Sequence, residues 1–221
     1  MASLCRNLGF PNVFPFISIK DSMLNLIIAF IISASAKGNF LPETFSAKFE
    51  QVYISTLTKK EKKSFGELDY KFPGNIRFEV EKPNNILFVS NNKTNWIYRP
   101  PFIEGEPGEL TIKKSEEIGL SGLLDTLNQG LENNPQFKID KKENRVKMIF
   151  NAKTSQKIGL KEGLLIFKTG NAIGFEAIEE IEVTYPDEKK VSFRLSQINP
   201  KVNFTGDHFN FTAPKNTNIT P

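Results

Sequence analysis

Hydrophobic and polar residues alternate along most of the chain beyond residue 40, a pattern typical of strands with one buried face. A Pro73-Gly74-Asn75 turn separates the first two clear runs and predicts a hairpin. The predicted strands are Gly66–Phe72, Ile76–Glu81, Ile86–Ser90, Trp96–Tyr98, Arg145–Phe150, Leu164–Phe167, Ile178–Tyr185, Val191–Gln197 and Phe209–Phe211. Short alternating strands with polar outer faces predict an antiparallel sheet with one dry face.

One stretch follows the helical period instead. Residues Gly119–Asn133 carry a single apolar stripe, made of Leu120, Leu123, Leu124, Leu127 and Leu131. This helix must bury its stripe, and the dry face of the sheet is the available surface. Leu41–Gln51 fits either a short helical start or a strand, and the polar tail Pro214–Pro221 is expected to fray. The pattern predicts a curved sheet with one helix on it, and a hydrophobic pocket between them if the sheet curls.

The N-terminal region predicts export. Met23–Ala36 reads MLNLIIAFIISASA, an apolar run that ends in a small-residue cleavage site and follows Lys20. We therefore expect residues 1–36 to be a removed signal peptide and residues 37–221 to form one domain; a buried N-terminal helix is the alternative. The only cysteine, Cys5, lies in the removed segment, so the mature chain would have no disulfide. That combination suits a bacterial periplasm.

Charge and composition narrow the functions. The net charge of +4 becomes +3 without residues 1–36, and it is spread along the chain, which does not predict nucleic-acid binding. The densest charged run, Lys59–Lys63, predicts a solvated loop or a contact with acidic headgroups or an acidic partner. The chain has 20 Phe against one Trp, and because Phe has no polar group, this favours an apolar interior or pocket.

Catalytic motifs are missing from the sequence. His208 is the only histidine, and without a mature cysteine the chain cannot assemble an ordinary zinc site. It contains no G-x-S-x-G, no P-loop and no G-x-G-x-x-G. An exported hydrolase that uses paired carboxylates stays open. We expect a binding protein rather than an enzyme, with no catalytic residues, metal or cofactor.

Several short segments resemble the family of periplasmic outer-membrane lipoprotein carriers, the LolA family. Phe45–Gln51 (FSAKFEQ) is similar to its opening F-x-A-x-F-x-Q, and Gly66–Pro73 to its G-x-L-x-x-x-R-P strand. Further matches follow in order: Phe78, Pro83 with Leu87–Ser90, Trp96–Tyr98 for W-x-Y, Pro101–Phe102, and Phe209–Pro214 for F-x-F-x-x-P. Residues 115–175 match only in kind, as a helix followed by strands.

The resemblance implies an incomplete antiparallel β-barrel covered by an α-helical lid. It implies a soluble periplasmic carrier of a Gram-negative bacterium that holds the acyl chains of lipoproteins and shuttles them from the inner to the outer membrane. The expected partners are acylated lipoproteins as cargo, an inner-membrane lipoprotein-releasing ABC transporter and an outer-membrane lipoprotein receptor, with the carrier a monomer. The alternatives are a lipid-binding or lipoprotein-sensing module of the same fold and, from another class, the exported hydrolase.

The expected lipid-binding site follows from two observations together: which residues share one face of the predicted strands and helix, and which segments resemble the LolA family. The cavity-lining candidates are Phe49, Leu68, Tyr70, Phe72, Phe78, Val80, Trp96 and Tyr98, and the lid candidates are Leu120, Leu123, Leu124, Leu127 and Leu131. Phe72 stands where the family has an arginine that ties the lid shut, and a phenyl ring cannot donate those hydrogen bonds. Arg77 and Arg99 are candidate substitutes, and otherwise apolar contact would hold the lid.

Overall fold

The alternating segments form strands of one sheet. The computed structural model describes residues 39–114 and 119–221. The predicted signal peptide, residues 1–36, lies outside that range. The strands in this part of the chain are β1 (Thr44–Ile54), β2 (Glu61–Lys71), β3 (Asn75–Lys82), β4 (Ile86–Asn91), β5 (Thr94–Arg99), β6 (Gly108–Lys114), β7 (Phe137–Lys142), β8 (Arg145–Phe150), β9 (Glu162–Phe167), β10 (Ile178–Thr184), β11 (Lys190–Asn199) and β12 (Thr217–Thr220).

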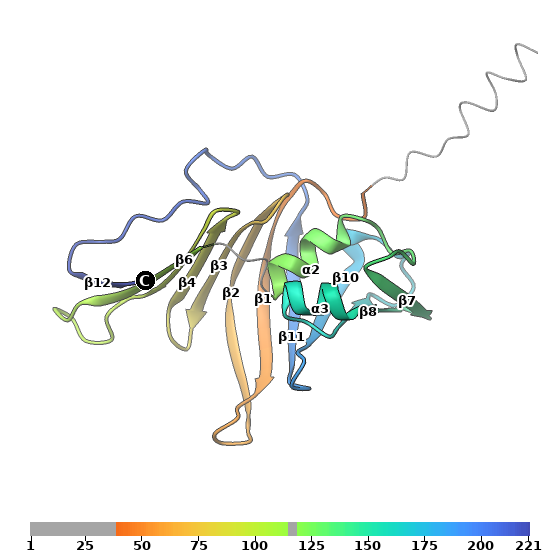
Figure 1. Cartoon of the computed structure of the whole chain (residues 1–221), viewed down its shortest axis with the longest axis horizontal. Helices are drawn as coiled ribbons and strands as arrows, with labels where there is room; N and C mark the ends of the chain where they lie inside the picture. Colours follow the sequence, from red (N-terminus) through yellow and green to blue (C-terminus); the bar gives the residue numbers. More distant parts are fainter. Residues whose placement is uncertain (1–38, 115–118) are drawn as a thin grey trace, which may run out of the picture. The chain divides into compact units, whose positions relative to one another are not determined.

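Strand order shows an unclosed barrel. Across the described residues, twelve strands pair in the order β12-β6-β5-β4-β3-β2-β1-β11-β10-β9-β8-β7. The edge strands β12 and β7 do not pair with each other, so the sheet stays open (Figure 1). Consecutive strands pair antiparallel from β1 to β6 and from β7 to β11, β1 pairs antiparallel with β11, and β12 joins β6 in parallel. The predicted fold class, an incomplete antiparallel barrel with a helical cover, is confirmed.

Strand register divides the sheet into two faces. Phe49 of β1 lies opposite Gly66 of β2, and Leu68 of β2 lies opposite Phe78 of β3. Because side chains opposite one another in a sheet share a face, these residues lie on one side, which we call the inner face. Residues between them, such as Arg77, lie on the other side, the outer face.

Two α-helices of the described residues lie on the inner face (Figure 1). Helix α2 (Leu120–Leu127) is the predicted leucine-striped helix, shorter than expected, and its buried residues include Leu123, Leu124 and Leu127. Helix α3 (Ala152–Ile158) was not predicted, because its sequence AKTSQKI has no apolar stripe. The residues that cap this helix could have revealed it in the sequence. The Asn151 side chain accepts a hydrogen bond from the Thr154 amide, and Gly159 ends the helix in the left-handed conformation.

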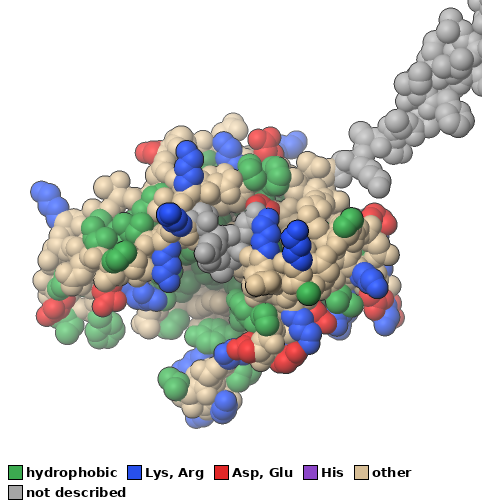
Figure 2. All heavy atoms as spheres, in the orientation of Figure 1, with side chains coloured by type: hydrophobic (Ala, Val, Ile, Leu, Met, Phe, Trp, Pro, Cys, Tyr) green, Lys and Arg blue, Asp and Glu red, His purple; other side chains and the backbone are tan. Residues whose placement is uncertain are grey.

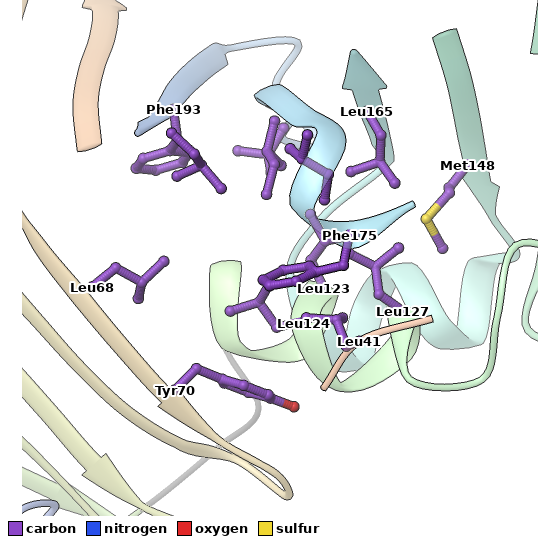
Figure 3. Packing of buried hydrophobic residues seen from close by; sticks show 14 of the residues in the cluster. Leu41, Leu68, Tyr70, Leu123, Leu124, Leu127, Met148, Leu165, Phe175 and Phe193 are labelled. Atoms are coloured by element: carbon purple, nitrogen blue, oxygen red, sulfur yellow. The ribbon is translucent and has the colours of Figure 1, made fainter. Parts of the chain in front are cut away.

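The hydrophobic core lies between these helices and the inner face. Leu123, Leu124 and Leu127 of α2 pack among Met148 and Leu165 of the sheet (Figure 3). A short 3₁₀ turn, η1 (Phe175–Ala177), adds Phe175 to the same cluster. The core therefore joins strands from both halves of the sheet through α2.

The C-terminal segment differs from its prediction. Phe209–Phe211 is not a strand, since residues 206–209 form a turn and no strand pairing follows until β12. The tail that was expected to fray contains β12, which pairs in parallel with β6. The segment crosses the outer face instead: His208 lies 2.7 Å from the Asp69 carboxylate, and the Phe211 ring lies 5.1 Å from that of Tyr98. It covers a face that would otherwise expose aromatic rings.

Gly66 is required where β1, β2 and β3 meet. A Cβ atom there would lie 1.8 Å from the Glu79 carbonyl oxygen and 2.9 Å from the Phe49 ring. Gly66→Ala is expected to lower the free energy of unfolding by about 3 kcal/mol, because backbone must move to admit the methyl group. Urea unfolding measures this loss. Gly206→Ala is the control, since nothing lies within 4 Å of that position.

Candidate functional site

The inner face of β3, β4 and β5 is apolar and incompletely covered. Phe78, Ile86, Phe88 and Ile97 lie there, and each is half-buried. Register brings them together, because Phe78 pairs with Phe88 and Phe88 with Ile97. Figure 2 shows this side of the molecule hollowed beside the helices, with hydrophobic side chains gathered in the hollow. We call these four residues the apolar floor.

Six of the eight predicted lining residues lie on or next to the inner face. Phe49, Leu68, Tyr70 and Val80 are buried there and belong to the core. The Phe78 ring is stacked on that of Phe49, 4.2 Å between centroids, and joins the core to the apolar floor. The sixth, Phe72, follows β2 at the β2–β3 turn with 36% of its surface exposed, and its amide donates to the Glu43 carbonyl.

Trp96 and Tyr98 lie on the outer face, which differs from the prediction. Trp96 pairs with Val89, and Val89 pairs with Arg77, so all three project opposite to Phe78. The prediction took these two residues from the match to W-x-Y, whereas the alternation of side chains along β5 places Ile97 between them on the inner face. The Tyr98 ring packs against Gly108, where a Cβ would lie 2.8 Å from the tyrosine hydroxyl, and against Phe211.

The predicted lid residues gather in the core. Leu123, Leu124 and Leu127 are at most 1% exposed, and Leu120 packs against the same cluster. Leu131 lies beyond the end of α2, yet it is also buried. The stripe therefore faces the sheet as its period predicted, and α2 lies where a lid would lie.

Two glycines let α2 approach its neighbours closely. A Cβ on Gly122 of α2 would lie 2.9 Å from the Ile158 side chain of α3, and a Cβ on Gly163 of β9 would lie 3.0 Å from Leu123. The Gly119 amide also donates to the Ile158 carbonyl. Helix α2 thus rests on α3 and on the β9 side of the sheet at short range.

A polar tie joins α2 to the other half of the sheet. Asp125 of α2 accepts two hydrogen bonds at Oδ1: one from the Tyr70 hydroxyl at 2.6 Å and one from the Gly74 amide at 2.9 Å. Tyr70 and Gly74 stand two residues before and after Phe72, so the tie lies beside the position where the family's arginine was expected. We call Asp125, Tyr70 and Gly74 the latch.

Neither predicted arginine provides this tie. Arg77 lies on the outer face and forms an ion pair with Glu79 at 3.1 Å. Arg99 ends β5 with an exposed side chain. The prediction placed the hydrogen-bond donor on the sheet, at an arginine. The structure keeps the donors on the sheet, as a hydroxyl and an amide, and supplies a carboxylate from the helix.

The latch shifts the ionisation of Tyr70. Burial, followed by the hydrogen bond to Asp125 and its charge, raises the pKa of the Tyr70 hydroxyl far above its ordinary value. The unfolded chain ionises at this residue near pH 10. A raised pKa in the folded state means that stability is fully present below about pH 10 and is lost as the pH rises above it.

Tyr70→Phe is therefore expected to flatten the alkaline loss of stability. Above about pH 10 the slope of unfolding free energy against pH should become shallower by up to about 1.4 kcal/mol per pH unit. Urea unfolding between about pH 7 and pH 11 measures the slope. Below about pH 9 the two proteins should differ by a constant amount, and parallel curves above about pH 10 would contradict the assignment.

Those polar groups near this face that the structure describes do not form a metal cluster. Within residues 39–114 and 119–221, no group of three His, Cys, Asp or Glu side chains could hold a metal ion. His208 and Asp69 pair on the outer face, away from the apolar floor. Throughout the described part of the chain, the helices are also too short or too polar to cross a bilayer.

The strand order and the apolar inner face together define an unclosed antiparallel β-barrel with a helical cover over an apolar surface. The model of the family "Outer membrane lipoprotein carrier protein LolA" matches residues 42–212. The chain belongs to this LolA family.

Named relatives cover nearly the same length. An outer-membrane lipoprotein carrier protein from Francisella tularensis subsp. novicida (strain U112) is 26% identical over 211 residues, 89% of this chain and 97% of the relative. One from Legionella pneumophila (strain Lens) is 25% identical over 181 residues, 80% of this chain and 83% of the relative. The crystal structure of a LolA superfamily protein from Nitrosomonas europaea has a TM-score of 0.46 and 8% identity, covering 83% of this chain and 97% of that one.

Proposed function

We propose that the chain carries lipoproteins by holding their acyl chains between α2 and the inner face of the sheet. The apolar floor is the observation that supports this most directly. Phe78, Ile86 and Phe88 are half-buried beside a complete core, so they offer apolar surface without leaving the fold incomplete. The names of the Francisella and Legionella relatives support lipoprotein as the cargo.

The energetics require a cover that can move. Each CH₂ group that leaves water contributes about 0.8 kcal/mol, so one acyl chain contributes several kcal/mol. A carrier must also release its cargo, and a helix that fills the site when cargo is absent offsets part of that energy. Leu123, Leu124 and Leu127 of α2 are packed in the core beside the apolar floor, and the latch holds α2 by two hydrogen bonds that cargo entry would break.

The carrier would work in the periplasm after removal of residues 1–36. It would receive cargo from an inner-membrane ABC transporter and deliver it to an outer-membrane receptor. We revise the set of residues proposed to contact the acyl chains. Six of the eight predicted residues are retained: Phe49, Leu68, Tyr70, Phe72, Phe78 and Val80. Three residues of the apolar floor are added: Ile86, Phe88 and Ile97. Trp96 and Tyr98 are omitted because of their register.

Purification without detergent tests the proposal. The chain would be expressed in its periplasmic form and analysed by native mass spectrometry, and then incubated with membranes that contain triacylated lipoprotein. Co-purified lipoprotein, or its extraction from the membranes, is the expected result. Free phospholipid as the sole ligand would favour a general lipid-binding module, and an empty protein that extracts nothing would contradict the carrier function.

A further inference from the structure

The β1–β2 hairpin presents an exposed apolar tip. Leu57 at its turn is 93% exposed, and Ile54 at the end of β1 is 58% exposed. Backbone hydrogen bonds define the turn: the Ser55 amide donates to the Lys60 carbonyl, and the Lys59 amide donates to the Ser55 carbonyl, both at 2.9 Å. The tip is therefore an ordered turn that directs a large apolar side chain into solvent. The hairpin projects beyond the neighbouring strands at the bottom of Figure 1.

The same tip is strongly basic. Residues 54–63 contain four lysines and one glutamate, a net charge of +3. Lys63 forms ion pairs: its Nζ atom lies 2.8 Å from the Glu50 carboxylate and 4.0 Å from the Glu61 carboxylate. In the described part of the chain, no ion pair joins Lys59, Lys60 or Lys62 to a carboxylate. Figure 2 shows hydrophobic and basic side chains together on this projecting lobe.

Neighbouring acidic side chains do not neutralise these lysines. The turn between β10 and β11 lies beside the hairpin and contains Asp187 and Glu188. Asp187 forms an ion pair with Lys189, and Glu188 forms one with Lys161. The hydrogen bond from Lys189 lowers the pKa of the Asp187 carboxyl. The positive charge of the hairpin tip thus remains available to a partner.

A pocket connects the tip to the inner face. It has a volume of about 550 Å³ and lies between the hairpin and the β10–β11 turn. Its lining includes Leu57 and Ile54 of the tip together with Tyr53 and Val191. Tyr53 and Val191 are paired in register on the inner face, along the same strands as Phe49 and Phe193. An apolar surface therefore continues from the exposed tip toward the proposed cargo site.

We propose that the β1–β2 hairpin tip is a contact site for the surface of an anionic phospholipid membrane. Leu57 enters the boundary between headgroups and acyl chains, while Lys59, Lys60 and Lys62 lie against lipid phosphates. Neither element suffices alone, because a single apolar side chain and a small cluster of lysines each bind a bilayer weakly. This contact requires no lipoprotein, so it can be tested independently of the carrier function.

Vesicle flotation of the mature chain tests the site. The protein would be mixed with vesicles of phosphatidylcholine alone, or of phosphatidylcholine and phosphatidylglycerol in equal amounts. We expect binding to the anionic vesicles and little to the neutral ones. Lys59→Gln/Lys60→Gln should weaken anionic binding by about 20-fold, and Leu57→Asn by about tenfold. Binding by the native protein should also fall steeply as salt shortens the Debye length from about 10 Å to about 3 Å.

Matched variants separate the site from general adsorption. Phe102, 94% exposed on another loop, gives Phe102→Asn as the apolar control. Lys138→Gln/Lys168→Gln removes the same charge from exposed positions elsewhere. Both controls should bind like the native protein, and circular dichroism should show every variant folded. The proposal is overturned if hairpin and control variants bind equally, or if neutral and anionic vesicles bind equally.

A fluorescent reporter tests insertion directly. In Leu57→Trp the new indole starts in solvent and should shift its emission to shorter wavelength when anionic vesicles are added. The native protein, which has Trp96 alone, gives the reference spectrum. An unshifted spectrum in the presence of bound vesicles would overturn the insertion of Leu57.

Discussion

Asp125→Ala is expected to lower the free energy of unfolding by about 4 kcal/mol. Hydrogen bonds to a charged group contribute about 1.5–3 kcal/mol each, and this carboxylate accepts two. The Tyr70 ring is 0% exposed, so its hydroxyl would lose its partner inside the protein. Urea unfolding at neutral pH measures the loss. Binding of an apolar dye should rise in the same variant, because α2 loses its tie to the β2–β3 turn.

A double-mutant cycle shows whether the latch is responsible. Tyr70→Phe removes the donor together with its need for a partner, so it should cost less, about 1 kcal/mol. With phenylalanine in place, Asp125→Ala should then cost clearly less than it does alone, since the two groups interact. Asp125→Asn keeps an acceptor and should retain part of the stability. Additive losses would contradict a direct interaction between Asp125 and Tyr70.

An exposed carboxylate provides the control for charge. Asp140 of β7 lies 3.3 Å from Lys142 at the surface, with half of its side chain exposed. Asp140→Ala should change the free energy of unfolding by at most about 0.5 kcal/mol, because exposed pairs contribute little. A loss equal to that of Asp125→Ala would assign the effect to net charge instead of the latch.

The sequence predicted those strands whose two faces differ. In β2, β8 and β11, buried and exposed residues alternate, so periodicity identified both the strand and its buried face. It did not identify β12, whose four residues TNIT contain a single apolar side chain and which pairs with β6 alone. It also missed α3, where caps rather than an apolar stripe define the helix.

The site was harder to predict than the fold because it depends on register and distant contacts. Trp96 and Tyr98 have the right chemistry for an apolar site. However, side chains alternate between the two faces along β5, and these two lie on the outer face. Nothing in the local sequence distinguishes Asp125 from other polar residues of a helix, and its partner Tyr70 lies 55 residues away. Such pairs exist only once the helix is placed on the sheet, so local patterns cannot identify them.

Phe88→Asp is expected to reduce lipoprotein uptake by at least about tenfold. The side chain is half-buried on the apolar floor, opposite Phe78 and Ile97. Replacing it removes apolar surface that contributes about 1.5–3 kcal/mol when buried, and it requires a carboxylate to lose water when an acyl chain enters. Extraction of triacylated lipoprotein from membranes measures the loss.

The same substitution on the outer face separates binding from folding. Phe65 of β2 is 44% exposed and lies opposite Glu50, on the side away from the floor. Phe65→Asp should therefore leave uptake within about twofold of the native protein, since no acyl chain would contact it. If both variants stay folded and lose uptake equally, cargo does not lie on the inner face. If only Phe88→Asp loses it, the half-buried floor is where acyl chains bind, because the two proteins carry the same charge on the same sheet.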